Sequence, residues 1–526
     1  MLDRVVTAEE AASLIKDEDS VIVGGSAGMG VAESVLVAIE QRFLGGHGPR
    51  GLTVIHTTGV GAVTDRGLNR LVHKGLVGRV IGGNFGLQLP FMRELIVSNE
   101  IEAYNIPQGV LCQLYRAMAA GQPGIVTHVG LHTYMDPRQE GGRMNDATTG
   151  DMIEVVELSG REWLFYKVPR ANFALIRGTT ADEDGHVGME HEATTLEALS
   201  IAQAVHNAGG TVVCQVERLA QRGTLHPQMV RVPGFLIDHF VVDPEQMQNY
   251  AVRFDPSLCG ETTRPLATIK PDPLSMRRVI ARRAAFELSR NAVFNLGVGV
   301  SAAIPNVVAE EDMEDLVSLT VEAGVVGGIP GQGLYFGSSV NPRAIMDQGY
   351  MFDFYAGGGL DVAFVSFAEV DAEGNVNVTR FGDRNDGAGG FIEITQNAKR
   401  IVFSGTLTGG GLTVGIADGA VSIEREGSIR KFVPRVNQIS YNARLGQERG
   451  QNTKFISERA VLEMTPEGVM VTELAPGVRL REDVLDCMDF EPRVSSDLRQ
   501  MDPRIFREGP MGLRQFILER EAGSAP

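Results

Sequence analysis

Positions 318–330, SLTVEAGVVGGIP, hold one carboxylate, that of Glu322, in an otherwise apolar and glycine-rich run. The four β-compatible residues before it predict a buried strand over 318–321, with Glu322 at the strand's end. No lysine or arginine lies within ten residues on either side to form an ion pair. Glycines allow a ligand to come close, so this carboxylate could act as a base or a nucleophile. A solvated loop glutamate is the alternative that these residues leave open.

Ser26 is a second candidate nucleophile. It lies in GGSAG, at 24–28, which fits G-x-S-x-G between a predicted strand and a predicted helix. In this reading Ser26 would be the nucleophile of an α/β-hydrolase. In the α/β-hydrolase fold several strands precede the nucleophilic serine, whereas only one predicted strand precedes Ser26. The sequence also has no HGGG-type segment, and both features argue against a hydrolase. Neither leading strand is followed by G-x-G-x-x-G, and there is no P-loop, which argues against a dinucleotide or P-loop nucleotide site.

The elements that must position these residues follow a repeated pattern. The segment VIVGGSAGMGVAESVLVAIEQRF, at 21–43, has the order strand, glycine loop, helix, and NAVFNLGVGVSAAIPNVVAEE at 291–311 repeats it. This order is typical of the start of an α/β unit. Near the C-terminus, RAVLEMTPEGVMVTEL at 459–474 predicts a β-hairpin with TPEG as its turn.

The two halves also resemble each other further along. FALIRGTTADEDGHVGM at 173–189 is similar to VAFVSFAEVDAEGNVNV at 362–378. Likewise, HNAGGTVVCQ in the first half is similar to QNAKRIVFSG in the second half. The constant order predicts an α/β protein with two tandem, related, open α/β domains. We expect an N-terminal domain over 1–255, a proline-containing linker over 256–275 and a C-terminal domain over 276–526 that carries Glu322.

Composition narrows the choice of partner and compartment. The formal net charge is −18, which argues against nucleic acid as the main partner. Four scattered cysteines form no CxxC pair, so we expect neither a metal site nor a disulfide framework. No apolar run reaches the ~18 residues of a membrane helix, and the N-terminus lacks the apolar core of a signal peptide. We therefore expect a cytoplasmic protein without a membrane partner.

Six segments in order resemble the family I coenzyme A transferases, most closely the single-chain branch with acetate and propionate CoA-transferases, related to the 3-ketoacid enzymes. SLTVEAGVVGGIP resembles the family's E-x-G signature, which places its glutamate at Glu322. The other segments are NIPQG, NLGVG, EGNVNVTRFG, GAGGFIEITQNAKRIVFSGTL and ERAVLEMTPEGVMVTELAPGV. The resemblance runs almost from end to end, and each half implies one CoA-transferase-type domain.

The resemblance implies transfer of coenzyme A between an acyl-CoA and a short-chain carboxylic acid. The route is ping-pong, through a glutamyl-CoA thioester on Glu322. Coenzyme A is a substrate, and no cofactor is permanently bound. The implied oxyanion donors are the side-chain amides of Gln108 and Asn295 and the backbone N–H groups near Gly389 and Gly390.

By the same resemblance, the glycine loop of the first domain meets the thioester, so we expect coenzyme A or acyl contacts at Gly25, Ser26, Gly28 and Gly30. We expect a homo-oligomer, a dimer or a tetramer. The alternative function is an α/β-hydrolase-like acyl-CoA thioesterase that uses Ser26 as its nucleophile.

Overall fold

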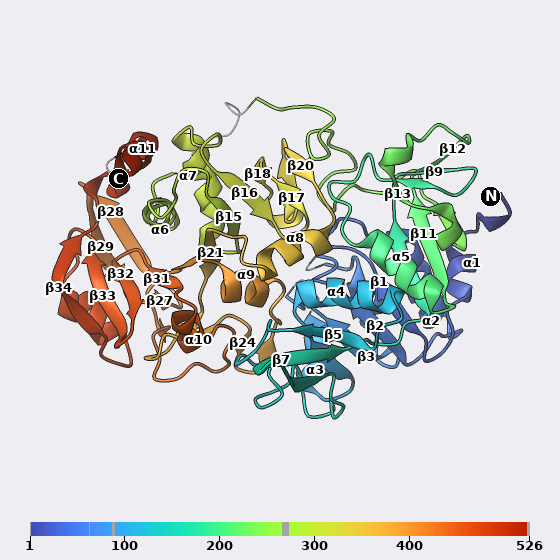
Figure 1. Ribbon diagram of the computed structural model, residues 1–526, viewed down its shortest axis with the longest axis horizontal. Helices are drawn as coiled ribbons and strands as arrows, with labels where there is room; N and C mark the ends of the chain where they lie inside the picture. Colours follow the sequence, from blue (N-terminus) through green and yellow to red (C-terminus); the bar gives the residue numbers. More distant parts are fainter. Residues whose placement is uncertain (1, 63, 87–89, 266–272, 523–526) are drawn as a thin grey trace. The chain divides into compact units, whose positions relative to one another are not determined.

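The computed structural model describes residues 2–62, 64–86, 90–265 and 273–522 of the chain (Figure 1). The chain divides into two compact units, and each is assembled from separate segments. Unit 1 comprises Met1–Thr263, Val321–Asp353 and Gly382–Glu393. Unit 2 comprises Arg264–Thr320, Phe354–Phe381 and Ile394–Pro526.

The unit boundaries do not follow a single cut in the sequence. The first change of unit, after Thr263, falls within the predicted linker 256–275, of which residues 266–272 lie outside the described residues. Two later segments of the sequence, 321–353 and 382–393, group with unit 1. Glu322 therefore belongs to unit 1, and the division into domains at 255 and 276 stays a prediction.

Unit 1 is built on a parallel sheet of seven strands in the order β14-β11-β8-β1-β2-β3-β4. Its strands are β1 (Ser20–Val23), β2 (Leu52–His56), β3 (Val77–Gly82), β4 (Glu102–Asn105), β8 (Phe173–Arg177), β11 (Thr211–Val216) and β14 (His239–Val242). The chain runs outward from β1 to β4 and then returns to β8 on the other side of β1. Adjacent loops of a parallel sheet commonly bind ligands where the strand order reverses in this way.

Helices cover both faces of this sheet. They are α1 (Ala8–Ser13), α2 (Glu33–Leu44), α3 (Pro90–Val97), α4 (Gln108–Ala119) and α5 (Ala198–Asn207). Val21 and Val23 of β1 share a buried cluster with Val35 and Ile39 of α2. Successive side chains of a strand point to opposite faces, and α4 and α5, which pack on each other, lie on the second face (Figure 1). Burial on both faces explains the continuous apolar runs in the strands.

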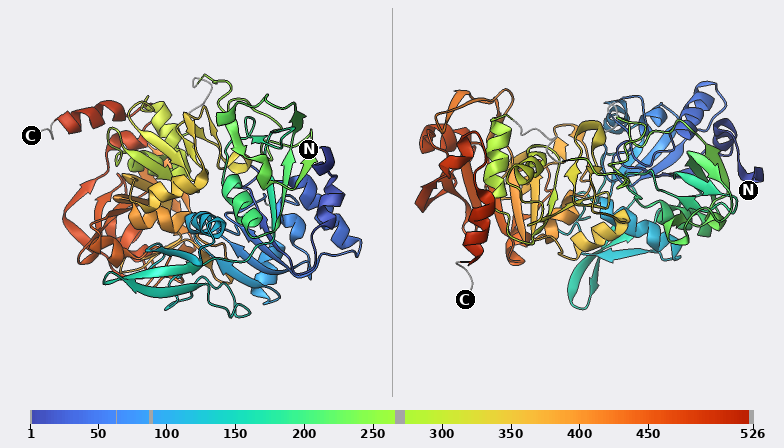
Figure 2. Two further views of the ribbon diagram at one scale, coloured as in Figure 1. Left: turned by 45° about the vertical axis from the view of Figure 1, so that its right-hand side comes forward. Right: turned by 90° about the horizontal axis from the view of Figure 1, so that it is seen from above.

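Smaller elements complete unit 1. The antiparallel sheet β5-β7-β6 includes a hairpin that projects from the unit in the right-hand view of Figure 2. A four-stranded sheet has the order β12-β9-β10-β13. The bounds of these strands are β5 (Gly124–Thr127), β6 (Ile153–Leu158), β7 (Arg161–Lys167), β9 (Thr180–Asp182), β10 (Val187–Gly188), β12 (Arg218–Ala220) and β13 (Val230–Val232). Later segments add β17 (Val325–Val326), β18 (Ile329–Pro330), β19 (Ser339–Val340), β20 (Ala344–Ile345), β25 (Arg384–Asn385) and the starts of α8 (Gln348–Ala356) and α9 (Phe391–Asn397).

In unit 2, parallel strands β16, β15, β21, β26 and β31 lie side by side, and β32 and β33 continue the sheet antiparallel. β34 then pairs with β33 in parallel. The strands are β15 (Val293–Leu296), β16 (Ser318–Val321), β21 (Val362–Ser366), β26 (Arg400–Ser404), β31 (Asn452–Ile456), β32 (Ala460–Thr465), β33 (Gly468–Leu474) and β34 (Arg493–Gln500). The helices are α6 (Met276–Ala285), α7 (Ile304–Glu310), α10 (Ala443–Glu448) and α11 (Leu513–Ala522). Short strands complete the unit: β22 (Glu369–Val370), β23 (Val376–Asn377), β24 (Arg380–Phe381), β27 (Thr408–Gly409), β28 (Thr413–Ala417), β29 (Ala420–Arg425) and β30 (Ile429–Arg430).

The predicted internal repeat is present in the order of elements. The order β8, β9, β10, α5, β11 in the first half recurs as β21, β22, β23, α9, β26 in the second, where the short strands β24 and β25 are inserted before α9. Asp182 and Asp371 each accept a backbone N–H bond from a residue four positions later. Gly185 and Gly374 both have a φ of 82°, which favours glycine. The expected α/β class, the strand over 318–321 and the hairpin with its TPEG turn are confirmed as well.

Over the described ranges, every helix is too short or too polar to cross a bilayer.

Candidate functional site

The carboxyl ends of the parallel strands in unit 1 lie at one edge of the sheet. There β1 leads into the glycine loop 24–30, β2 into Thr57, β3 into Gly83, and β4 through Pro107 into Gln108. The residue before a proline avoids the helical region, so Pro107 separates β4 from α4 and fixes where the helix begins. The sequence-predicted residues Gln108 and Ser26 are thereby placed at the same edge.

Glu322 follows β16, and its half-buried side chain meets Gly390. A methyl group on Gly390 would lie 2.8 Å from Oε2 of Glu322, so any larger residue there would displace the carboxylate. Burial raises the pKa of the Glu322 carboxyl group to about 7, and the backbone N–H of Gly390, which donates to the carboxylate, opposes this rise. Across the described part of the chain, no arginine or lysine forms an ion pair with Glu322.

The loop that carries Gly390 is held by loops of the central sheet. The Gly389 N–H donates to the Gly83 carbonyl at 2.7 Å, and the Ala388 N–H donates to Oδ1 of Asn105 at 3.0 Å. The two predicted backbone donors are therefore not equivalent. The N–H of Gly389 is used in fixing the loop, whereas that of Gly390 faces the Glu322 carboxylate.

Gln108 is the first residue of α4, and its side chain is buried. Its Nε2 donates to Oε1 of Gln348 at 3.3 Å, and Nε2 of Gln348 donates to Oε2 of Glu197 at 2.9 Å. The hydroxyl of Thr57 donates to the other oxygen of Glu197. Burial raises the pKa of Glu197 to about 8. This chain of hydrogen bonds through Gln348 and Glu197 fixes the orientation of the Gln108 side-chain amide.

Asn295 belongs to unit 2, where it is fully buried and lies one residue before the end of β15. It pairs in register with Thr320 of β16. Its Nδ2 donates to the Thr320 carbonyl at 3.1 Å and to the Tyr355 hydroxyl at 3.0 Å. Both amide hydrogens therefore have partners inside unit 2, so Asn295 could donate to a substrate only by giving up one of them.

The glycines of the loop 24–30 serve protein packing as well as any ligand. A methyl group on Gly28 would lie 2.6 Å from the Tyr250 backbone nitrogen, and one on Gly30 would lie 2.8 Å from Cδ1 of Leu196. Gly25 has a φ of 140° and also lines, with Gly30 and Glu197, a narrow cavity in unit 1. The cavity shares Met189, Glu192 and Thr195 with a larger, open cavity whose lining includes Arg231 and Arg343.

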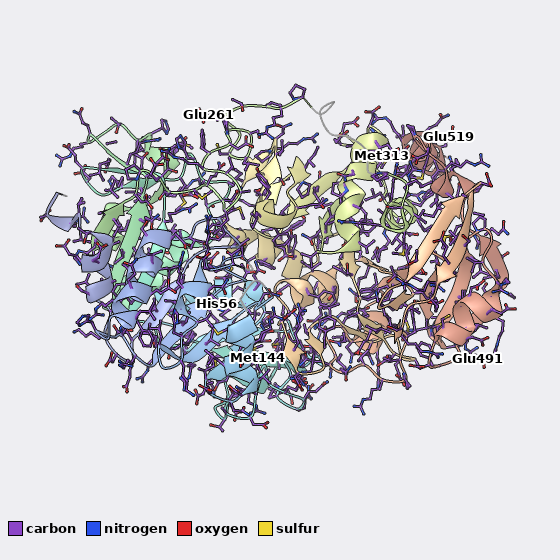
Figure 3. All side chains as sticks on the ribbon, turned by 180° about the vertical axis from the view of Figure 1, so that it is seen from behind. His56, Met144, Glu261, Met313, Glu491 and Glu519 are labelled. Atoms are coloured by element: carbon purple, nitrogen blue, oxygen red, sulfur yellow. The ribbon has the colours of Figure 1, made fainter. Side chains whose placement is uncertain are left out.

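Ser26 is buried, and its backbone pairs with Met29 in a tight turn. The hydrolase alternative requires a base that forms a hydrogen bond with the Ser26 hydroxyl. Over the described ranges, no histidine forms such a bond. His56, labelled in Figure 3, ends β2, and its Nδ1 lies 2.7 Å from the Thr58 carbonyl oxygen. Burial lowers the pKa of His56 to about 4, which keeps it neutral.

Three buried residues at this site were not among the sequence-predicted ones: Glu197, Gln348 and Glu393. Oε1 of Glu393 accepts the Val110 N–H at 3.0 Å, at the start of the helix that Gln108 begins. Burial raises the pKa of Glu393 to about 8, and the negative charge of Glu322 adds to the rise. The two carboxyl groups therefore interact.

Comparison with known proteins gives a consistent result. Residues 5–243 match the family described as Coenzyme A transferase. The chain is 44% identical over 520 residues to acetate CoA-transferase YdiF of Escherichia coli O157:H7, covering 98% of this chain and 97% of that protein. It is 41% identical to the caffeate CoA-transferase of Acetobacterium woodii, covering 97% and 98%. The crystal structure of the E. coli O157:H7 acyl-CoA transferase YdiF as a thioester complex with CoA superimposes with a TM-score of 0.92, at 43% identity and 97% coverage of both chains.

Proposed function

This chain belongs to the coenzyme A transferase family and transfers coenzyme A between an acyl-CoA and a carboxylic acid, and we propose that it does so through a thioester on Glu322. The observation that carries the proposal is the carboxylate of Glu322 itself, half-buried without a cationic partner among the described residues and accepting the Gly390 N–H. A carboxylate in that setting is available to act as a nucleophile.

The proposed reaction has two half-reactions. A carboxylate oxygen of Glu322 attacks the thioester carbonyl carbon of the acyl-CoA, the carbon–sulfur bond breaks, and the coenzyme A thiolate leaves an acyl-glutamyl anhydride. The thiolate then attacks the Glu322 carbonyl carbon and displaces the acyl group as a carboxylate. The resulting glutamyl-CoA thioester reacts with a second carboxylate by the reverse steps, which regenerates Glu322.

Each attack builds negative charge on a carbonyl oxygen, and preorganised N–H groups stabilise such charge. We assign this role to the Gln108 and Asn295 side-chain amides and to the backbone N–H of Gly390. The support for Gly390 is its interaction with the Glu322 carboxylate. Gly389 then contributes by position, since its own N–H is bound to Gly83.

We assign the acyl-CoA to the larger open cavity of unit 1, which shares Met189, Glu192 and Thr195 with the narrow cavity that Gly25 and Gly30 line. Gly28 contributes through the turn that it closes against Tyr250, and Ser26 through its place in the same loop. Coenzyme A is a substrate of this enzyme class. That no cofactor is permanently bound, and that the chain forms a homo-oligomer, stay predictions.

Replacing Glu322 by glutamine tests the proposal. We expect Glu322→Gln to lower kcat with acetyl-CoA and propionate by at least about 1000-fold, because the amide cannot form the covalent intermediate. Glu491→Gln, at an exposed glutamate labelled in Figure 3, is the matched control and should keep wild-type kcat. Near-normal transfer by a folded Glu322→Gln variant would remove Glu322 from the mechanism.

A further inference from the structure

We propose that Glu393 is a positioning residue: its carboxyl group caps the N-terminus of α4 and so holds Gln108 and Gly390 in place beside Glu322. The inference rests on the proposed function, because it concerns the residues assigned there to oxyanion stabilisation. Glu393 itself is not assigned a contact with the substrate.

The first observation is that α4 lacks a cap of its own. Its N-cap residue is Pro107, and no side chain next to it in the sequence accepts a hydrogen bond from the first turn. The first N–H groups of a helix have no partner within the helix and need one elsewhere. Here the Gln108 N–H donates to the Gly389 carbonyl at 3.0 Å, and the Val110 N–H donates to Oε1 of Glu393 at 3.0 Å. Both partners come from one short segment, 389–393.

The second observation is where that segment leads. Gly390, which meets the Glu322 carboxylate, directly precedes α9, and Glu393 lies in the first turn of that helix. One carboxyl group thus connects the helix that begins with Gln108 to the backbone that faces Glu322. The ring of Phe352 packs against both sides, since methyl groups on Gly109 or Gly390 would lie within 2.8 Å of its side-chain atoms. Close packing on both sides means that losing the cap shifts the two donors relative to each other.

The third observation concerns the protonation state of the cap. Glu393 is 1% exposed, and among the described residues its Oε2 accepts no hydrogen bond. The titratable groups that face it are Glu322, Tyr166 and Cys112, and none is a cation. Burial raises the pKa of Glu393 to about 8, and the charge of Glu322 adds to the rise, which favours the neutral acid. The carbonyl oxygen of a neutral carboxyl group is sufficient to accept the Val110 N–H and so to cap α4.

The test compares Glu393→Gln, which keeps a carbonyl acceptor, with Glu393→Met, which has similar length and no comparable acceptor. Steady-state kinetics use acetyl-CoA as donor and propionate as acceptor. For Glu393→Met we expect kcat to fall about 10- to 100-fold, the effect of misplacing reacting groups by up to about 1 Å, with the KM for acetyl-CoA changed less than about threefold. Glu393→Gln should stay within about threefold of wild type in both constants.

Hydrogen exchange gives a second readout that does not depend on activity. The Val110 amide should lose protection in Glu393→Met and keep it in Glu393→Gln. Glu311→Met is the matched control, because Oε2 of this buried glutamate accepts the Leu513 N–H at 2.7 Å at the start of α11 in unit 2. It removes the same kind of contact and should lower Tm without lowering kcat.

Wild-type kcat in a folded Glu393→Met variant would overturn the inference. So would a Glu393→Gln variant as slow as Glu393→Met, because the charge and not the acceptor would then matter. If Glu393→Met does not fold, Glu393→Asp withdraws the acceptor by one carbon and should show the same loss of kcat and of Val110 protection; a wild-type result there also overturns it. Transfer by Glu322→Gln, measured alongside, would instead show that the proposed function has failed.

Discussion

The ionisation of Glu322 sets the conditions under which it can attack a thioester. Only the carboxylate is a nucleophile, yet burial raises its pKa to about 7 and so favours the neutral acid. The Gly390 N–H acts in the opposite direction. Burial also raises the pKa of Glu393, to about 8, and the charge of Glu322 adds to that rise. Raising the pH therefore increases the share of Glu322 side chains that can react.

We predict that kcat/KM for acyl-CoA rises with pH through an apparent pKa of about 7 and levels off above it. The direction follows because the acid form, which dominates below the pKa, cannot attack, and kcat/KM reports ionisations of the free enzyme. Initial rates at low acetyl-CoA between pH 5.5 and 8.5 measure it, with far-UV circular dichroism at each pH as the folding control. A flat profile over this range would contradict the assignment of a raised pKa to the attacking group.

At the scale of elements, the sequence predicts local structure well and long-range partners poorly. The strand before Glu322, the TPEG hairpin and the repeated order of elements are all visible in short patterns, and all are present. The contacts from Gln108 to Gln348 and from Val110 to Glu393 join positions 240 and 283 residues apart. No local pattern marks such pairs.

The glycines likewise show that long-range partners cannot be predicted from the sequence. A glycine in a loop indicates that something comes close to the backbone, but not what does. For Gly28 and Gly30 the neighbours are Tyr250 and Leu196, and for Gly390 the neighbour is the carboxylate of Glu322. Gly389 and Gly390 are adjacent in one motif, and only their separate hydrogen bonds distinguish their roles.

Alanine at these two adjacent positions should therefore have different effects. In Gly390→Ala the new methyl group meets Oε2 of Glu322 and the Phe352 ring at 2.8 Å, so we expect kcat to fall by about 100-fold or more. In Gly389→Ala the nearest atom is 3.6 Å away, but φ is 54°, which costs an alanine roughly 1–2 kcal/mol. That variant should melt a few degrees lower and keep most of its kcat. Equal kinetic losses in both would mean that the loop acts only as a whole.

At the scale of the whole molecule, the two halves of the sequence do not coincide with the two compact units. The segments 321–353 and 382–393 lie late in the sequence and pack with unit 1. Glu322, Gly390 and Glu393 thereby join Gln108 at the edge of the first sheet, whereas Asn295 lies in unit 2. The tandem repeat was visible in the sequence because motifs of the first half recur in the same order in the second half. The grouping of segments 321–353 and 382–393 with unit 1 could not be predicted, because it leaves no mark on composition or periodicity.

The central claim is that coenzyme A becomes bound to Glu322, and mass spectrometry tests it most directly. The protein is mixed with acetyl-CoA in the absence of an acceptor acid, quenched at low pH, and measured intact and after proteolysis. We predict an added mass equal to coenzyme A minus water, located on the peptide that contains Glu322 and missing in Glu322→Gln. An acetyl group on Ser26, or an unmodified Glu322 peptide in protein that still transfers coenzyme A, would contradict it.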